Sequence, residues 1–371
     1  MQEIRRDQLE DICATALRAA GASEGDARLV ADHLVDNDTV GHHSHGVMRL
    51  REYVDAIDRG ELIPSARPRI VSESASTARI DGGWAFGQVV AEFASDLAIE
   101  KARVTGTSSV TIRSVKHIGR LGRYAEKVAG SGMASIIFTC GGGHGINQAP
   151  FGGVERKLSS NPVAMSFPSG LDGPYVMDMA TSVVAEGKVR MYRGRGLQTP
   201  SGWIIDSEGN PTTNPQDYYD GGAILPLGRE EGHKGYALAF MVELFAGLLS
   251  GGGIPGDPTD SFSNESMIIV LDPERFVPLE EARERASIMT DHIKSTRLRD
   301  ESRPIMYPGE IEAAARAANQ ERPIELAGST WEGIVSVLRQ FSLPEPPGDL
   351  PDLGIRVEEV LAALDEGRLE R

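Results

Sequence analysis

The sequence predicts an α/β fold in which helices pack on a mixed sheet and a helical domain is assembled from both ends of the chain. Three observations predict it. Apolar residues recur at helical spacing over roughly the first 60 residues, short β-branched runs alternate with helical periodicity from about residue 68 to residue 271, and helical periodicity returns from residue 279. We expect residues 1–70 and 311–371 to form the helical domain and residues 71–310 the α/β domain.

The N-terminal part is expected to contain three helices. Ser23 and Asp26 resemble a capping box that opens the second helix. A third helix is predicted from Ser44 to Arg59, where Gly60 ends it. Its apolar stripe consists of Val47, Leu50, Val54 and Ile57.

Short apolar runs bounded by turn residues predict the strands of the sheet. The predicted strands cover residues 110–112, 134–139, 163–168, 175–179 and 267–271. The predicted helices cover residues 118–129, 234–249, 279–297, 310–318 and 357–364. The first two strands and the helix between them form a βαβ unit, which indicates an α/β rather than an all-β chain.

Composition excludes several classes of protein. A formal charge of −16 with a pI near 5.0 would repel a nucleic-acid backbone. Two cysteines, Cys13 and Cys140, are too few for a disulfide framework or a thiolate zinc site and suit a reducing cytoplasm. The charged N-terminus lacks the apolar core of a signal peptide, and the longest apolar stretch, residues 236–249, is too short to cross a bilayer.

The segment from Gly41 to Tyr53 is the richest in chemistry. On a continuous helix His45, Arg49 and Tyr53 would step by four residues along a polar stripe aimed away from the core. Histidine exchanges protons near neutral pH and arginine forms a fork that fits a carboxylate, so the stripe favours a small carboxylate substrate. A solvated helix face and a metal site formed by His43 and His45 are the alternatives.

Four further motifs stand where ligands commonly bind. Gly119 and Gly122 follow His117 between a strand and a helix, which either lets a cofactor approach the backbone or only allows close helix packing. The pattern is not G-x-G-x-x-G, so a Rossmann assignment would be wrong. Asp178 follows a strand and could orient an imidazole or simply cap a helix. Lys234 at a helix start is a candidate ligand for a phosphate or carboxylate. The fourth motif, residues 307–310, indicates only a turn before a helix.

Together these motifs resemble those of the malate/L-lactate dehydrogenase family, which includes ureidoglycolate dehydrogenase, diketogulonate reductase, sulfolactate dehydrogenase and piperideine-carboxylate reductase. The resemblance extends over roughly residues 5–340. It rests on Ser44 to Arg49 with Tyr53, His117-Ile-Gly119, Asn161-Pro162, Asp178 to Ser182, Lys234 to Tyr236 with Glu243, and Pro308 to Glu310.

The resemblance implies the mixed α/β fold of that family, not the doubly wound Rossmann sheet, and a homodimer to which the helical domain contributes. It implies NAD or NADP as cofactor, with NAD favoured, and no metal. The expected cofactor contacts are His117, Gly119, Gly122, Asn161, Asp178, Met179, Ala180, Thr181, Lys234, Gly235, Pro308, Gly309 and Glu310.

The resemblance also implies the chemistry of the site. His45 would be the catalytic acid and base, with Ser44 and Asp178 completing its relay, and His117 would be either the proton acceptor or a cofactor contact. Arg49 would bind the substrate carboxylate, with Tyr53 beside it. The implied reaction moves a hydride between NAD(P)H and a small 2-oxo or 2-hydroxy acid such as malate or lactate. A cyclic imino acid and ureidoglycolate are alternative substrates.

The sequence departs from the family at two places. Residues 159–162 read Ser-Ser-Asn-Pro where the family often has Gly-Thr-Asn-Pro, and residues 140–144 replace more polar residues after a strand. These changes leave the substrate open. The rival interpretations are a hydrolase that uses Ser44, His45 and Asp178, although the chain lacks a G-x-S-x-G elbow, and a ligand-binding homologue without catalytic activity.

Overall fold

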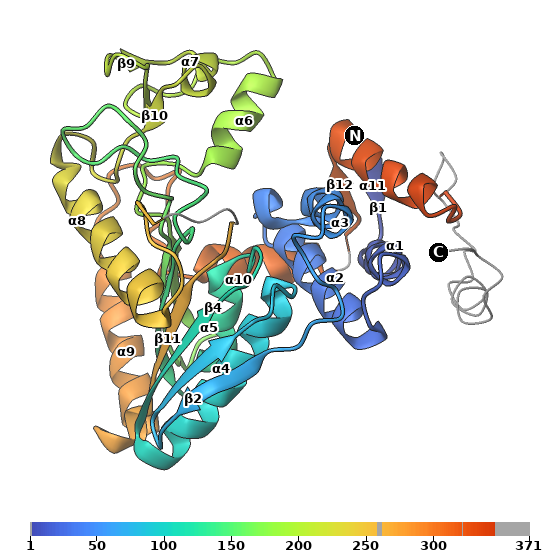
Figure 1. The fold of residues 1–371 in the computed structure, drawn as a ribbon. Helices are drawn as coiled ribbons and strands as arrows, with labels where there is room; N and C mark the ends of the chain where they lie inside the picture. Colours follow the sequence, from blue (N-terminus) through green and yellow to red (C-terminus); the bar gives the residue numbers. More distant parts are fainter. Residues whose placement is uncertain (1, 258–261, 321, 346–371) are drawn as a thin grey trace.

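A seven-stranded mixed sheet forms the centre of the computed structural model, which describes residues 2–257, 262–320 and 322–345 (Figure 1). The strand order is β2-β3-β4-β11-β5-β6-β7. The strands are β2 (Arg69–Glu73), β3 (Thr77–Asp81), β4 (Thr107–Arg113), β5 (Ala134–Thr139), β6 (Val163–Phe167), β7 (Tyr175–Met179) and β11 (Ser266–Leu271). Only β3 and β4 pair in parallel, and the other neighbours are antiparallel. The predicted mixed α/β fold is confirmed.

Helices cover both faces of this sheet because its strands alternate apolar side chains between the two faces. In β5, Ile137 joins the core beneath α4 (Gly87–Thr105) and α5 (Leu121–Gly130). The next residue, Phe138, packs on the opposite side against the cluster formed with α8 (His233–Val242) and the π-helical turn η4 (Glu243–Leu248). The α9 helix (Leu279–Lys294) lies at the left of Figure 1, below α8 in this view.

The two ends of the described chain share one hydrophobic core. Strand β1 (Gln2–Ile4) pairs antiparallel with β12 (Ile324–Leu326). The helices around them are α1 (Arg6–Ala19), α2 (Glu24–Thr39), α3 (Leu50–Asp58) and α11 (Gly328–Gln340). Ser23 caps α2 by accepting a hydrogen bond from the Asp26 amide at 3.2 Å, as the sequence predicts. The domain boundaries at residues 70 and 311 stay predictions.

A small third unit lies above the central sheet in the view of Figure 1. It holds α6 (Glu186–Gly194), α7 (Pro215–Tyr219) and the short strands β8 (Ile204–Ile205), β9 (Pro211–Thr212) and β10 (Ala223–Ile224) around a separate apolar cluster. Figure 1 shows this unit at the top, with α6 turned toward the N-terminal helices. The first turn of α6 reaches them, since a Cβ built on Gly187 would lie 3.2 Å from Ser44 Cβ.

Two predicted helices differ from the structure. The prediction of a continuous helix from Ser44 to Arg59 is wrong, because the chain forms two 3-10 turns before α3 begins. These turns are η1 (His43–His45) and η2 (Val47–Arg49). Gly46 between them is extended, with φ −83° and ψ −157°. The helix predicted over residues 234–249 changes to π geometry at Glu243. The helix predicted over residues 357–364 lies outside the described residues.

The remaining predicted elements occur close to their expected positions. The strands at β4, β5, β6, β7 and β11, the helix α9 and the helix α10 (Glu310–Asn319) are present, and α5 begins three residues later than predicted. No helix among the described residues combines the length and apolar character that a bilayer crossing requires.

Candidate active site

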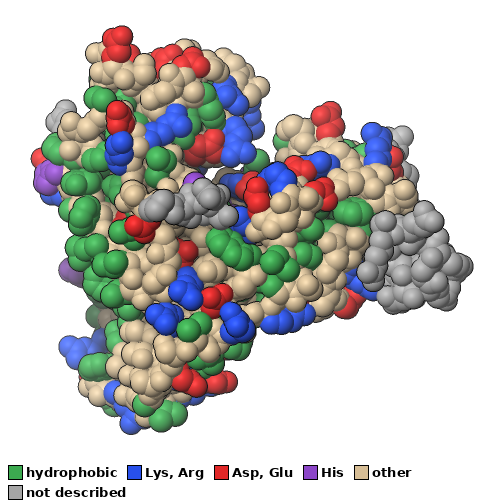
Figure 2. Space-filling view, in the orientation of Figure 1, with side chains coloured by type: hydrophobic (Ala, Val, Ile, Leu, Met, Phe, Trp, Pro, Cys, Tyr) green, Lys and Arg blue, Asp and Glu red, His purple; other side chains and the backbone are tan. Residues whose placement is uncertain are grey.

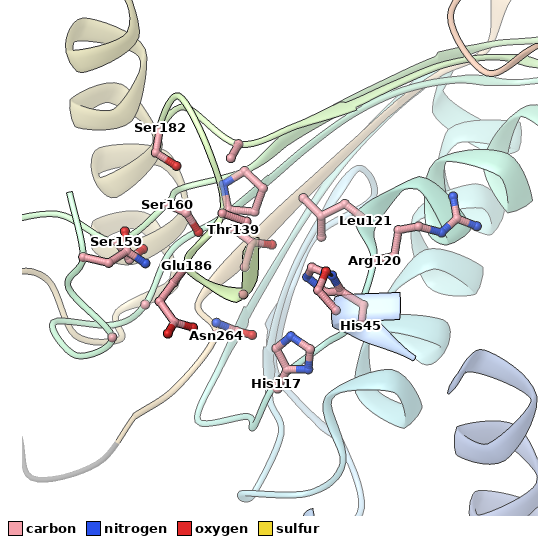
Figure 3. Close-up of a pocket in the computed structure, with 18 of the residues that line it drawn as sticks. His45, His117, Arg120, Leu121, Thr139, Ser159, Ser160, Ser182, Glu186 and Asn264 are labelled. Carbon is pink, nitrogen blue, oxygen red and sulfur yellow. Dashed lines mark hydrogen bonds between the residues drawn. The ribbon is translucent and has the colours of Figure 1, made fainter. Parts of the chain in front are cut away.

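A cavity of about 570 Å³ lies between the N-terminal helices, the end of β7 and the first turn of α6. Its size suits a small ligand together with part of a cofactor. Figure 3 shows His45 and His117 close together on one wall and Ser159, Ser160 and Ser182 on the other. The predicted site residues on the cavity wall are Ser44, His45, Arg49, His117, Gly119, Asp178, Met179 and Ala180.

A buried aspartate positions the turn that carries His45. The Asp38 carboxylate accepts hydrogen bonds from the Val47 amide at 2.7 Å and pairs with His43 Nδ1 at 2.8 Å. Asn37 Nδ2 donates to the His45 carbonyl at 3.0 Å. A Cβ on Gly46 would lie 2.2 Å from Asp38 Oδ2, so only glycine lets the carboxylate approach this closely. These contacts explain why a break replaces the predicted helix here.

The His45 and His117 rings are stacked, with centroids 5.4 Å apart and planes at 26°. Ser44 Oγ lies 2.9 Å from His45 Nδ1. Burial, with the nearby Arg49 charge, lowers the pKa of His45 to about 3, and the same two causes hold the pKa of His117 well below its ordinary value. Both rings are therefore neutral near pH 7 and able to accept a proton.

Tyr53 supports His117 from behind. Its hydroxyl lies 2.8 Å from His117 Nδ1, and Gln88 Nε2 donates to the same hydroxyl at 2.8 Å. Tyr53 is 3% exposed and lies in the core, whereas the sequence predicted it on a polar stripe aimed away from the core and in contact with substrate. The predicted orientation of Tyr53 is wrong, because Tyr53 follows Leu50 by three residues in α3 and shares its buried face. Its contact with substrate stays a prediction.

Arg49 brings a guanidinium to the cavity wall. Its Nε donates to the Ser44 carbonyl at 2.8 Å, and one terminal nitrogen pairs with Glu52 at 2.5 Å. Across the cavity, Lys188 and Arg190 of α6 also line the wall, and Arg190 pairs with Glu186. Figure 2 shows Lys and Arg side chains gathered over α6. The cavity therefore offers positive charge to an anionic ligand although the chain as a whole is acidic.

Asp178 lies on the cavity wall but contacts a different partner from the one expected. Its carboxylate accepts a hydrogen bond from the Gly122 amide at 2.6 Å. Among the described residues no hydrogen bond joins it to Ser44 or His45. Burial raises the pKa of Asp178 above its ordinary value. Its part in a relay with His45 stays a prediction.

Several predicted cofactor residues lie away from the cavity. Gly122 and Thr181 are held by backbone hydrogen bonds, Asn161 is buried against Glu243, and Lys234 pairs with Glu231 on the surface. Gly235 packs against the Leu227 backbone. The predicted residues Pro308, Gly309 and Glu310 pack beside β7, where the Val176 amide donates to the Pro308 carbonyl and Glu310 pairs with Lys294. Contacts from these eight residues to a cofactor stay predictions.

The cavity wall fits a nicotinamide cofactor in two respects. Gly119 lines the wall beside His117 with a φ of +82°, a backbone conformation that favours glycine. Asn147 Oδ1 is buried without a partner among the described residues, so a ligand amide could donate to it. No group of three or more potential metal ligands occurs in the described part of the chain.

Sequence reasoning did not find four residues that shape the site. They are Gln88, Asp38, Arg190 and Glu52. Two of them have a local signal, since Glu52 follows Arg49 by three residues and Arg190 follows Glu186 by four, both spacings typical of helical ion pairs. Gln88 and Asp38 are recognisable only through contacts made in three dimensions.

Comparison with known proteins identifies one family. The family model described as malate/L-lactate dehydrogenase matches residues 4–335. Malate dehydrogenase of Pyrococcus horikoshii is 41% identical over 319 residues, which cover 83% of this chain and 86% of that protein. The structure of a putative malate/lactate dehydrogenase from E. coli is similar with a TM-score of 0.86 and 32% identity, over 99% of each chain. A Δ1-piperideine-2-carboxylate reductase from Pseudomonas syringae is similar with a TM-score of 0.79 and 27% identity, over 91% of this chain and all of that one.

Proposed function

This chain belongs to the malate/L-lactate dehydrogenase family, and we propose that it moves a hydride between a nicotinamide cofactor and a small 2-hydroxy acid or its 2-oxo acid. The observation that carries the proposal is the pair of neutral histidines beside the Arg49 guanidinium in one cavity. The histidines suit proton transfer at an oxygen, and the guanidinium suits the adjacent carboxylate. Malate, lactate and related hydroxycarboxylates are the expected substrates.

The proposed role of Arg49 is to bind the substrate carboxylate. Its Nε already donates to the Ser44 carbonyl, which fixes the guanidinium beside the histidines. A carboxylate bound there would place the neighbouring carbon close to both rings. Holding the reacting carbon in position beside the catalytic groups increases the rate of the chemical step by orders of magnitude. Glu52 competes with substrate for Arg49, since it pairs with the guanidinium at 2.5 Å.

We assign the proton transfer to His117, although the sequence favours His45. A buried hydrogen-bonded chain continues from His117 Nδ1 to Tyr53 and Gln88, and it holds the ring in one orientation. Among the described residues, His45 Nδ1 bonds to the adjacent Ser44, and no hydrogen bond links that pair to Asp178, whose carboxylate accepts from the Gly122 amide. His45 then lies beside the reacting oxygen and helps to orient it.

The nicotinamide, when bound, supplies the hydride for reduction and accepts it in oxidation. We retain NAD as the preferred form over NADP, and kcat/KM measured with each form tests that preference. The expected location is the cytoplasm, where the buried thiols of Cys13 and Cys140 remain reduced.

The test of the proposed function is the change in nicotinamide absorbance when the purified protein is given NADH or NADPH and a panel of 2-oxo acids. Turnover of pyruvate or oxaloacetate supports the proposal. Turnover restricted to a cyclic imine such as piperideine-2-carboxylate would make imino-acid reduction the activity. Absence of turnover with every member, together with measurable cofactor binding, would support a catalytically silent homologue, and ester hydrolysis would support the hydrolase.

We propose that the protein forms a homodimer through an apolar face on α8 and η4. Four apolar side chains on this face are 45–55% exposed: Phe240, Met241, Leu248 and Leu249. Figure 2 shows hydrophobic side chains along the left-hand margin of the molecule, where α8 lies in Figure 1. Exposed apolar groups in such number are typical of an interaction surface. This face lies outside the helical domain that the sequence indicated. Light scattering of the wild type and of Leu249→Glu tests it, since the variant should be monomeric.

A further inference from the structure

Gln88 is a buried amide that none of the motifs includes and that stands behind the proposed proton carrier. It lies in the first turn of α4 and is 1% exposed. Its Nε2 donates to the Tyr53 hydroxyl, and its Oε1 has no partner among the described residues. A buried amide of this kind costs stability unless something offsets the loss. The burial of Gln88 therefore suggests that its amide has a role in the chemistry of the site.

The direction of the Gln88 hydrogen bond determines where the proton of His117 resides. A phenol has one hydrogen, and the amide N–H of Gln88 occupies a lone pair of the Tyr53 oxygen. Among the described residues His117 Nδ1, 2.8 Å away, is the acceptor within reach of the phenol hydrogen, so we infer that Tyr53 donates to it. With Nδ1 accepting, the neutral ring carries its own hydrogen on Nε2. Nε2 is the ring nitrogen left to meet a substrate in the cavity, so the resting enzyme presents a donor to the oxygen of a 2-oxo acid.

We propose that Gln88 is a positioning residue that acts through Tyr53 to sustain a two-proton relay from Tyr53 through His117 to the substrate oxygen. The inference rests on the proposed function, since it needs His117 to be the proton carrier. In reduction, hydride addition to the carbonyl carbon leaves negative charge on the oxygen. The Nε2–H bond of His117 breaks and its proton binds that oxygen, while the Tyr53 O–H bond breaks and its proton binds Nδ1.

The relay returns to its starting state by taking up one proton from solvent, which is the proton that reduction of a 2-oxo acid by NAD(P)H consumes. After the hydroxy acid leaves, Nδ1 gives its proton back to the Tyr53 oxygen, and Nε2 takes one from water in the cavity. During the step the Tyr53 oxygen carries negative charge in a buried place. Burial raises the pKa of Tyr53, while the Gln88 N–H and the Arg49 charge lower it. Gln88 thus stabilises the charged form that the relay requires.

A double-mutant cycle tests the proposal, with steady-state reduction of a 2-oxo acid as the readout. Gln88→Met keeps the length and volume of the side chain and removes the donor. We expect it to lower kcat by about 10-fold to 100-fold with KM within a factor of about 2, because the interaction matters only after charge has moved. Tyr53→Phe should lower kcat at least as much. In the Tyr53→Phe background Gln88→Met should cost nothing further, because Gln88 acts through the missing hydroxyl.

Two results would overturn the relay: an unchanged kcat in Gln88→Met, or losses that multiply in the double variant, as two unrelated packing defects would. A second measurement does not depend on the variants folding. Nitrogen-15 spectra of histidine-labelled wild type should show the His117 hydrogen on Nε2, and a hydrogen on Nδ1 would contradict the inference. Loss of activity in His117→Asn together with full activity in Gln88→Met would reject the relay alone. An active His117→Asn would reject the assignment of proton transfer to His117, and absence of turnover in the wild type would reject the proposed function.

Discussion

The imidazole planes of His45 and His117 face each other at 26° with centroids 5.4 Å apart, although 71 residues separate them in the chain. Both rings line the same cavity, and both are neutral near pH 7 because burial opposes their protonation. The ring that transfers the proton can be identified by replacing each in turn with asparagine, which keeps a polar group of similar size.

His117→Asn should lower kcat/KM by about 10²-fold to 10⁴-fold, the usual contribution of a general acid or base. His45→Asn should cost less, about 10-fold, because the ring orients the oxygen without carrying its proton. Steady-state assays with one 2-oxo acid give both values, and quenching of protein fluorescence by the cofactor checks that binding survives. The opposite order of losses would restore His45 as the proton carrier.

Arg49→Lys should raise KM for the 2-oxo acid by about 10-fold to 100-fold. Lysine keeps the charge but loses the planar fork and the contact with the Ser44 carbonyl that aims it. Glu52→Gln is the matched control. It removes the carboxylate that pairs with Arg49, so KM should stay the same or fall. A raised KM in Glu52→Gln would show that the ion pair, and not the free guanidinium, binds the substrate.

The central sheet was predictable because each of its strands is a short apolar run between turn residues, as in Ala134–Thr139. Helix α4 was not predicted. Its sequence nevertheless carries the signal, because the buried residues recur at helical spacing from Gly87 to Ala102 while Glu92, Asp96 and Glu100 follow the opposite face. The strands β8, β9 and β10 contain two residues each, too few to show an alternating pattern.

Part of the cavity wall was predictable from the sequence, whereas the arrangement of the side chains was not, and contacts from the eight predicted cofactor residues that lie away from the cavity stay predictions. His45 and Arg49 were found because their chemistry is compressed into one segment. Their geometry depends on Asp38, eight residues before Gly46, whose carboxylate forces the break in the helix. The contact between Gln88, Tyr53 and His117 joins three elements that meet only after folding, and no local spacing encodes it.

Gly46→Ala should destabilise the protein by about 1–3 kcal/mol, the usual cost of forcing an atom into a packed region. The added Cβ would lie 2.2 Å from Asp38 Oδ2, and the carboxylate would have to leave the Val47 amide. Gly25→Ala is the control, because a Cβ there meets nothing within 4 Å and alanine suits a helix better. Denaturant unfolding of both variants gives the free energies, and equal stability of the two would refute the proposed role of Gly46.

The pH dependence of stability should report the burial of His45. Its pKa is about 3 in the folded protein and near 6.5 when unfolded, so the unfolded chain binds the extra proton as the pH falls below about 6.5. A histidine with a lowered pKa therefore removes stability as the pH falls. Relative to His45→Asn, the wild type should lose roughly 1.4 kcal/mol of unfolding free energy between pH 7.5 and pH 5.5.

His43 provides the contrast for that measurement, because the Asp38 carboxylate raises its pKa above the ordinary value. The stability that His43 contributes is present below about pH 6.5 and is lost as the pH rises through its raised folded-state pKa. Relative to His43→Asn, the wild type should therefore gain stability between pH 7.5 and pH 5.5, the opposite sign. Urea unfolding of the wild type, His45→Asn and His43→Asn at pH 7.5 and pH 5.5 gives the unfolding free energies. The titratable groups that all three proteins share cancel when each variant is subtracted from the wild type. A gain of stability in both differences would mean that His45 is charged in the folded protein and would contradict the neutral pair on which the proposed chemistry depends.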